Sequence, residues 1–333
     1  MLILIYFSMR INSIISNKCF DINDHKMKVT LKEIKYAIAV SKHLNFRRAS
    51  EECNVSISSL SSAIKNLEHK INFEIFERNN KKVIVTSLGR EFLFEAKEII
   101  LKVKELENLA DASSDSLSSN ISLGIIPTIG PYLLPIVLPS LKNKYPNTNL
   151  KIIEAQSHSL IQKIENGEID MGIIALPYSL DRIVTQVFWA EDFYWISHIE
   201  NLQHKQSVKS DDLKKEDLML LEDGHCLKDQ VADLCNVNIS STLNMSASSL
   251  STLVELVAGK MGSTLVPELS LEQLVTKNGA LQKAHLDEPS PHRELAFAYR
   301  ESFKGQKDIQ LLKELFYGEL SDHFGREGSS IEA

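Results

Sequence analysis

Residues 46–71 read FRRASEECNVSISSLSSAIKNLEHKI, which is two helical patterns separated by a short turn. Ser56 ends the turn and is a good N-cap, because a serine hydroxyl accepts a hydrogen bond from the first turn of a helix. In the second pattern, apolar residues recur at spacings of 4, 3 and 4, which predicts a helix with one buried face. They are Leu60, Ile64, Leu67 and Ile71.

The opposite face of this second helix carries short hydroxyl side chains and one cation. Short side chains let a helix approach the floor of a DNA groove, where hydroxyls bond phosphates or base edges. An apolar pattern over 30–38 predicts one more helix before the pair, and residues 74–76 and 83–86 predict a hairpin with a basic tip. We therefore predict a winged helix-turn-helix. Its predicted DNA-binding residues are Arg47, Arg48, Ser56, Ser58, Ser59, Ser61, Ser62, Lys65, Lys81 and Lys82.

The charge distribution favours this interpretation over a plain three-helix bundle with solvated serines. From Met27 to Val85 there are 11 Lys and Arg against 6 Glu and no Asp, a net charge of +5. The whole chain of 333 residues carries −7, so the remainder carries −12. A basic module on an acidic body predicts that one end binds a polyanion, here a double-stranded DNA operator.

The rest of the chain divides into a helix, a linker and an α/β domain. Apolar residues from Leu88 to Ala110 follow a near-heptad pattern, which predicts a helix that pairs with a second copy. A Ser-rich linker follows over 111–120. Strand-like and helix-like segments then alternate, which predicts an α/β domain with mostly parallel sheets and room for two lobes around a cleft. The expected strands are 121–126, 150–154, 171–176, 193–197, 218–221, 263–266 and 295–299.

We accordingly expect the DNA-binding domain at 27–86, the linker helix and hinge at 87–117, the regulatory domain at 118–322 and a tail at 323–333. Residues 1–26 are expected to be a disordered extension or the product of a start codon placed too early. The four cysteines fit neither a disulfide scaffold nor a zinc site, and no apolar run reaches the roughly 20 residues that span a bilayer. We expect a cytoplasmic protein that needs no metal or cofactor and does not bind membranes.

Several motifs resemble the LysR-type transcriptional regulators, in order and spacing, over residues 27 to about 315. They are residues 46–56, Leu60-Ser61, Leu67-Glu68, residues 75–78, Thr86 and Gly89. This resemblance implies a winged helix-turn-helix, a dimerising linker helix and a two-lobed, periplasmic-binding-protein-like effector domain. The recognition helix departs from the family, because Ile57-Ser58 replace the usual Gln-Pro pair. Losing a base-reading amide puts the usual operator preference in doubt.

The second half of the chain is similar to the hydrogen-peroxide-sensing members of that family. The similarity lies in residues 126–135, 154–158 and 221–230, and in Cys235, nine residues after Cys226. It implies that Cys226 reacts with peroxide and that Cys235 then forms a disulfide with it. The pocket residues that it implies are Thr128, Ser157, His225, Asp229 and Arg293, with Ser157 standing where the family usually has Thr.

The chemistry suits these residues, because peroxide sensing needs a thiolate and donors for the leaving hydroxide. Asp223 is expected to cap a helix whose first turn holds Cys226, where the helix dipole favours a thiolate. If residues 226–235 are helical, the cysteines lie about 13.5 Å apart. A disulfide needs Cα atoms within roughly 7 Å, so oxidation must unwind this segment. Its apolar residues, Leu227, Val231 and Leu234, predict modest packing.

We therefore predict a non-enzymatic regulator that senses hydrogen peroxide and acts as a homodimer or homotetramer with RNA polymerase. Two alternatives stay open: a LysR-type regulator that binds a small metabolite, with incidental cysteines, and a thiol peroxidase. Residues 27–85 serve no purpose in a peroxidase. A free-standing periplasmic binding protein is excluded by the DNA-binding half and by the lack of a signal sequence.

Overall fold

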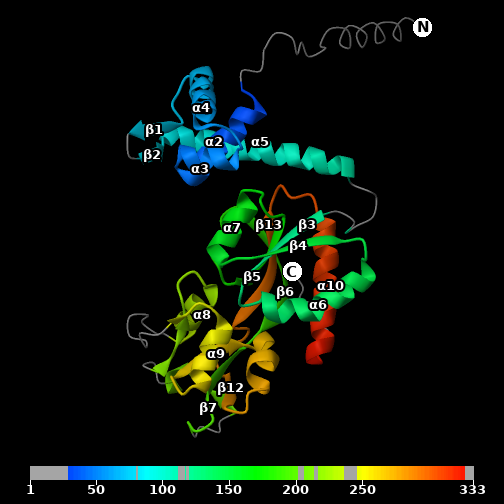
Figure 1. Cartoon of the computed structure of the whole chain (residues 1–333). Coiled ribbons are helices and arrows are strands. Elements are labelled where there is room, and N and C mark those ends of the chain that lie inside the picture. The colour runs from blue at the N-terminus through cyan, green and yellow to red at the C-terminus, as the bar shows by residue number, and fades with distance from the viewer. Residues whose placement is uncertain are drawn as a thin grey trace, which may run out of the picture. The chain divides into compact units, whose positions relative to one another are not determined.

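The computed structural model describes residues 29–79, 82–111, 117, 120–201, 206–213, 217–235 and 246–326. The chain divides into two compact units, Met1–Ala110 and Asp111–Ala333, and each is considered by itself (Figure 1). Several predicted features lie outside the described residues. They are the extension over 1–26, the wing residue Lys81, most of the Ser-rich linker and the tail after Arg326.

The N-terminal unit has short helices, a hairpin and one long helix. Its elements are α2 (Leu31–His43), α3 (Phe46–Glu52), α4 (Ile57–Ile71), β1 (Phe76–Asn79), β2 (Lys82–Val85) and α5 (Ser87–Asp111). The side chains of Thr30, Asn45 and Ser56 cap α2, α3 and α4 by accepting hydrogen bonds from amides of the first turn. These caps satisfy amides that have no partner within a helix. The winged helix-turn-helix predicted from the sequence is confirmed.

Helix α4 buries one face as its spacing predicts. Leu60, Ile64 and Leu67 have no exposed surface and pack with residues of α2 and α3, whereas Ile71 at the end of the helix is only partly buried. The exposed side chains of the other face include Ser58, Ser59, Ser62 and Lys65. Core packing therefore fixes how α4 is turned and which of its residues face solvent.

The hairpin is antiparallel, and its register runs from Phe76 opposite Val85 to Asn79 opposite Lys82. Its first strand starts two residues later than expected. The Glu68 carboxylate of α4 accepts hydrogen bonds from the amides of Ile75 and Phe76, at 2.9 and 3.0 Å. Glu68 therefore ties the start of the hairpin to α4, while the Ile75 carbonyl accepts a hydrogen bond from the Thr86 amide at 3.0 Å.

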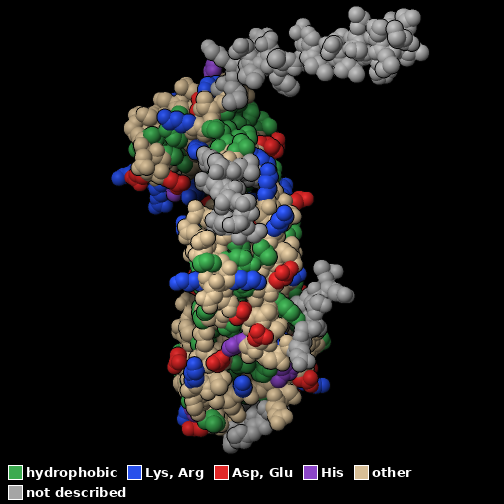
Figure 2. Space-filling view, turned by 90° about the vertical axis from the view of Figure 1, so that its right-hand side faces the viewer, with side chains coloured by type: hydrophobic (Ala, Val, Ile, Leu, Met, Phe, Trp, Pro, Cys, Tyr) green, Lys and Arg blue, Asp and Glu red, His purple; other side chains and the backbone are tan. Residues whose placement is uncertain are grey.

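Helix α5 is one continuous helix of 25 residues, as predicted. Ala96 is buried, whereas Leu88, Ile99 and Leu106 are exposed along the predicted seam. Exposed hydrophobic side chains and Lys and Arg side chains are both visible on the surface of this unit (Figure 2). An exposed apolar seam of this length fits a helix that pairs with a second copy, which remains a prediction.

The second unit contains two larger sheets, one for each lobe of Figure 1. The lobe with the five-stranded sheet is called the first lobe below. The five-stranded sheet has the order β4-β3-β5-β13-β6, and the four-stranded sheet has the order β11-β7-β12-β8. Two further short strands, β9 and β10, pair with each other. The bounds are β3 (Asn120–Ile125), β4 (Asn149–Glu154), β5 (Met171–Leu176), β6 (Ile183–Glu191), β7 (Phe193–His198), β8 (Ser207–Val208), β9 (Leu220–Leu221), β10 (Ser246–Ala247), β11 (Ser263–Pro267), β12 (Leu281–Leu286) and β13 (Arg293–Arg300).

The expectation of mostly parallel sheets is wrong, because both larger sheets are mixed. Strand β3 pairs in parallel with β4 and β5, but β13 pairs antiparallel with β5 and β6. In the other sheet β7 is antiparallel to both β11 and β12. The cause is the path of the chain, which leaves the first lobe after β6 and returns as β13, running against the strands already in place.

Helices cover both lobes. They are α6 (Gly130–Lys144), α7 (Ser157–Glu165), α8 (Cys226–Leu234), α9 (Leu250–Ala258) and α10 (Gln306–Phe324), with short turns η1 (Ser210–Asp212), η4 (Glu268–Ser270) and η5 (Glu272–Thr276). One continuous apolar cluster runs through the unit and includes Cys226 and Cys235. Both cysteines therefore lie within packed structure.

Candidate functional site

Cys226 is the first residue of α8, as predicted, and only 4% of its surface is exposed. The expected cap is wrong: His225 occupies the N-cap position, and no side chain there bonds to the helix. Asp223 is exposed instead and pairs with Lys228 at 2.5 Å. Gly224 explains the difference, because its φ of +96° turns the chain between Asp223 and the helix.

The first lobe brings two buried polar side chains, Ser157 and Arg293, to this thiol, and a third, Thr128, to Arg293. Thr128 lies in the turn between β3 and α6, Ser157 is the first residue of α7, and Arg293 is the first residue of β13. Each is at most 2% exposed. Thr128 Oγ1 and Arg293 Nη1 are buried and form no hydrogen bond with any described part of the protein, and the interaction of Ser157 Oγ is with the Cys226 thiol. Unpaired buried polar atoms are costly, so this group of polar side chains around Cys226 and Arg293 indicates a binding site.

Arg293 is held by a second buried charge. Its Nε and Nη2 atoms lie 2.8 and 2.7 Å from Glu191 Oε1, and neither side chain is exposed. Glu191 Oε2 also accepts a hydrogen bond from the Leu269 amide at 2.7 Å. Arg293 Nη2 donates to the Thr128 carbonyl at 3.4 Å. Four segments of the chain are thus joined at this ion pair, which orients the guanidinium group.

The electrostatics of Cys226 differ from the expectation of a thiolate. Burial raises the pKa of the thiol above its usual value, because a charged sulfur would be poorly solvated. The Ser157 hydroxyl, the Arg293 charge and the Leu227 amide oppose this shift without overcoming it. Desolvation therefore outweighs the interactions that favour the thiolate.

His225 is buried beside the thiol, and its Nε2 lies 3.3 Å from Nε2 of Gln156. Gln156 also donates to the Asp223 carbonyl at 3.5 Å. A Cβ atom at Gly224 would lie 2.5 Å from Gln156 Oε1, so only glycine fits this turn without displacing the amide. Gln156 therefore positions the turn that carries His225 and Cys226.

Asp229 lies on the exposed side of α8 and so does not face the buried atoms directly. Desolvation raises the pKa of its carboxyl, the nearby Asp233 and Asp223 charges act in the same direction, and Lys228 opposes them. Burial raises the pKa of Tyr178, in the loop after β5, and the Asp229 charge acts in the same direction. The role of Asp229 as a pocket residue stays a prediction.

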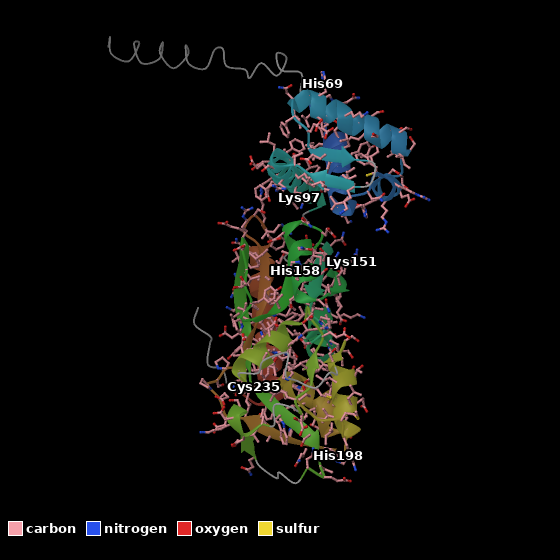
Figure 3. The ribbon with its side chains drawn as sticks, turned by 90° about the vertical axis from the view of Figure 1, so that its left-hand side faces the viewer. His69, Lys97, Lys151, His158, His198 and Cys235 are labelled. Carbon is pink, nitrogen blue, oxygen red and sulfur yellow. The ribbon has the colours of Figure 1, made fainter. Side chains whose placement is uncertain are left out.

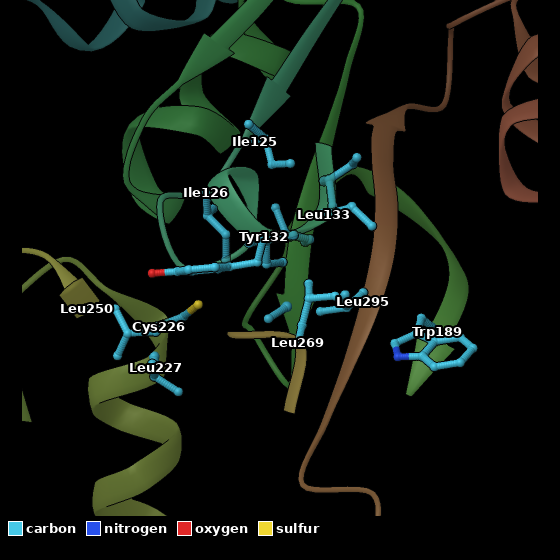
Figure 4. Packing of buried hydrophobic residues seen from close by; sticks show 14 of the residues in the cluster. Ile125, Ile126, Tyr132, Leu133, Trp189, Cys226, Leu227, Leu250, Leu269 and Leu295 are labelled. Atoms are coloured by element: carbon cyan, nitrogen blue, oxygen red, sulfur yellow. The ribbon is translucent and has the colours of Figure 1, made fainter. Parts of the chain in front are cut away.

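Three residues near the thiol were not predicted from the sequence. Glu191 gave no local signal, because its partner Arg293 lies 102 residues away. Gln230 of α8 is buried and donates weakly to the carbonyls of Ala175 and Pro177, at 3.5 and 3.4 Å. Figure 4 shows the sulfur of Cys226 pointing toward the ring of Tyr132. Burial raises the pKa of Tyr132 to about 12.

Cys235 lies at the other end of α8, where it is the C-cap residue (Figure 3). It is 1% exposed, and no disulfide joins the described cysteines, Cys53, Cys226 and Cys235. The residues between the two cysteines form a continuous helix, so at 1.5 Å per residue they are about 13.5 Å apart along its axis. The expected separation of the two thiols is confirmed for this form of the protein.

The predicted DNA-binding residues lie on exposed parts of the N-terminal unit. Arg47 and Arg48 start α3, and Arg47 pairs with Glu51 at 3.3 Å. Ser56, Ser58 and Ser59 form the cap of α4, Ser61 is partly buried, and Ser62 and Lys65 are exposed. Lys82 starts β2. Contacts of these side chains with DNA remain predictions.

Metal sites and membrane spans are both absent from the described part of the chain. In those ranges, no three His, Cys, Asp or Glu side chains are grouped so that they could hold a metal ion. None of the helices in the part of the chain that the structure covers is long and apolar enough to cross a membrane.

Residues 31–90 match the model of the bacterial regulatory helix-turn-helix proteins of the lysR family, and residues 114–320 match that of the LysR substrate binding domain. The chain is 33% identical to a probable hydrogen peroxide-inducible genes activator of Streptomyces viridosporus, over 81% of this chain and 88% of the relative. Full-length OxyR from Pseudomonas aeruginosa, solved as a cysteine variant, has a TM-score of 0.68 and 31% identity, covering 86% of this chain and 94% of that one.

A serine-for-cysteine variant of Corynebacterium glutamicum OxyR with hydrogen peroxide bound has a TM-score of 0.60 and 28% identity, covering 91% of this chain and 98% of that one. Two family models in sequence, together covering most of the chain, match the two units seen in the structure. This chain therefore belongs to the LysR family of DNA-binding transcriptional regulators and is homologous to the OxyR peroxide sensors.

Proposed function

We propose that this regulator senses hydrogen peroxide through Cys226 and controls genes of the oxidative-stress response. The observation that carries the proposal is the Cys226 thiol beside the Ser157 hydroxyl and the Arg293 charge, with the unpaired buried atoms Thr128 Oγ1 and Arg293 Nη1 in the same group. Hydrogen peroxide is uncharged and has two hydroxyl groups, so two hydroxyls and one N–H group suit it as hydrogen-bond partners. The homologous structure with bound peroxide supports the same interpretation.

The first step is the oxidation of Cys226 to a sulfenic acid. The sulfur attacks one peroxide oxygen, the O–O bond breaks, and the thiol proton joins the leaving hydroxide to form water. Burial favours the protonated sulfur at rest, so the thiol must lose its proton before the sulfur attacks. Arg293 and Ser157 favour the negative sulfur, and His225 and Asp229 are our candidates for carrying the proton.

The second step is the formation of a disulfide with Cys235. The Cys235 sulfur attacks the sulfenic sulfur of Cys226, the S–O bond breaks, and the hydroxyl leaves with a proton as water. The α8 geometry does not permit this while the helix is intact, because about 13.5 Å of helix separate two residues whose Cα atoms must approach to within roughly 7 Å. Oxidation therefore unwinds α8 and changes the shape of the lobe.

The unwound helix gives the sensor a way to act on DNA. We propose that the change alters contacts between copies in a homodimer or homotetramer, that the DNA-binding heads respond, and that RNA polymerase is engaged at the operator. A change of packing in a bistable element is how such switches reach distant sites.

Mapping of disulfide-linked peptides after the addition of micromolar peroxide tests the proposal. We expect one new link, between Cys226 and Cys235, and in the Cys235→Ser variant a sulfenic acid at Cys226 that a specific reagent traps. Labelling of Cys53 instead would show that the wrong thiol was assigned. Intact thiols would favour a metabolite-binding regulator, and sustained peroxide turnover with thioredoxin would favour a peroxidase.

The unwinding of α8 predicts opposite effects for two substitutions at Asp233, an exposed residue in the last turn of the helix. Alanine and glycine differ by roughly 1 kcal/mol in helix propensity, which is about a fivefold difference in the population of the unwound helix. We expect disulfide formation to be about fivefold slower in Asp233→Ala than in Asp233→Gly. Formation of the sulfenic acid should proceed at the same rate in both.

Stopped-flow fluorescence would separate the two steps, and hydrogen exchange would locate the change. When the protein is oxidised, the backbone amides between His225 and Cys235 should lose protection against hydrogen exchange. Equal disulfide rates in the two variants, or unchanged exchange in α8, would mean that the helix does not unwind. The packing of α8 is firmer than the sequence predicts, because Gln230 and Ala232 are buried together with Leu227 and Val231.

A further inference from the structure

Ile57, the first residue of α4, exposes 49% of its surface. The other large apolar residues in the body of this helix, Leu60, Ile64 and Leu67, have no exposed surface at all. Core packing therefore does not explain an isoleucine at this position. An exposed apolar side chain is common on proteins, but this one stands at the end of the helix that the fold presents to DNA.

The neighbouring hydroxyls are engaged in the cap of the helix. Ser56 Oγ accepts a hydrogen bond from the Ser59 amide at 3.1 Å and lies 3.0 and 2.8 Å from the hydroxyls of Ser58 and Ser59. These short side chains stay close to the backbone. Ile57 extends beyond them into solvent with four carbon atoms and no hydrogen-bonding group.

Exposed, positively charged residues near the start of α4 and along it suit contact with the phosphates of a DNA backbone. Arg47 and Arg48 are exposed on α3, and Lys65 is exposed two turns further along α4. Cations in such positions bind phosphates and fix the register of a protein on DNA without reading its sequence. The N-terminal residues of a recognition helix contact base edges in the major groove.

We propose that Ile57 reads the C5-methyl group of a thymine in the major groove of each operator half-site. Thymine is the base with a methyl group in that groove, and apolar side chains recognise it by contact. An isoleucine cannot donate or accept a hydrogen bond, so direct readout of a base edge at this position is by apolar contact. The inference rests on DNA binding by the helix-turn-helix and is independent of peroxide sensing.

The test replaces thymidine by deoxyuridine, which removes the methyl group and leaves base pairing unchanged. Duplexes selected from a random pool with the reduced full-length protein supply the probe, and each thymidine is replaced singly. We expect one position per half-site at which affinity falls about fourfold, the effect of one methyl group left in water. In Ile57→Ala the affinities of the thymidine and deoxyuridine duplexes should be nearly equal at that position.

Lys65→Ala is the matched control on the same helix. It should lower affinity for both duplexes by the same factor, reduce the salt dependence of binding by about one phosphate contact, and keep the fourfold preference. The proposal is overturned if no thymine recurs in the selected duplexes, if wild-type protein binds all deoxyuridine duplexes equally well, or if Ile57→Ala keeps the full preference. Ile57→Gln offers a second variant, which should select adenine in place of thymine at that position.

Discussion

Cys226→Ser should abolish the response to hydrogen peroxide while the reduced protein keeps its fold and its affinity for DNA. Serine is close to cysteine in size but is a far poorer nucleophile at neutral pH. The new hydroxyl would lie beside Ser157 Oγ, a buried hydroxyl that can share a hydrogen bond with it. We therefore expect intact folding together with peroxide-induced transcription at the background level.

Cys53→Ser is the matched control, since Cys53 is a free thiol that the mechanism does not use. This variant should respond like the wild type. An intramolecular disulfide that still forms in Cys226→Ser at micromolar peroxide would contradict the assignment.

The pH dependence of the same reaction follows from the state of the thiol. Burial raises the pKa of Cys226 above its usual value, so the fraction of thiolate grows as the pH rises toward that value. If the thiolate attacks, the rate of sulfenic acid formation should rise about tenfold per pH unit through the neutral range. A rate that levels off near pH 6 would require a thiolate at rest, contrary to the effect of burial.

Arg293→Met should have the largest combined effect on stability and reactivity. It leaves the Glu191 carboxylate buried without a counter-charge, and breaking a buried ion pair costs about 3–5 kcal/mol. It also removes the positive charge that lowers the thiol pKa. We expect a lower urea midpoint for unfolding of the sensor unit and slower sulfenic acid formation.

The double variant Arg293→Met/Glu191→Gln separates these two effects. Neither position is then charged, and the side-chain amide oxygen introduced in place of the Glu191 carboxylate can still accept the hydrogen bond from the Leu269 amide. Much of the lost stability should return, because no buried charge is left unpaired. The rate of oxidation should stay low, since the charge beside Cys226 is still missing. Recovery of both properties together would mean that Arg293 acts only on the packing of the domain.

Local features of the fold were predictable because they depend on neighbouring residues. Ser56 caps α4 and Leu60, Ile64 and Leu67 are buried, as spacing and propensity indicate. Cys226 at a helix start was also readable from its immediate sequence. Strands β6 and β12 were missed, because their burial is interrupted by exposed or half-exposed residues and no continuous apolar run marks them.

The errors at the site arose from burial and from contacts between distant residues. A helix start predicted a thiolate, but the solvation of Cys226 depends on packing against Tyr132 and other residues of the first lobe. Asp229, which the family resemblance implies as a pocket residue, lies on the exposed side of α8, and its role stays a prediction. The pairing of Glu191 with Arg293 depends on the return of the chain to the first lobe, which no local pattern reveals.

The place of β13 between β5 and β6 has a consequence for synthesis on the ribosome. Strand β5 ends at Leu176, and its neighbour β13 begins only at Arg293. At about 5–20 residues per second, the nascent chain waits roughly 6 to 23 s for that partner. Until then the edge of β5 is open to wrong pairing, and Glu191 has no arginine beside it. A newly made sensor therefore gains its reactive site among the last steps of translation, after the DNA-binding unit has emerged.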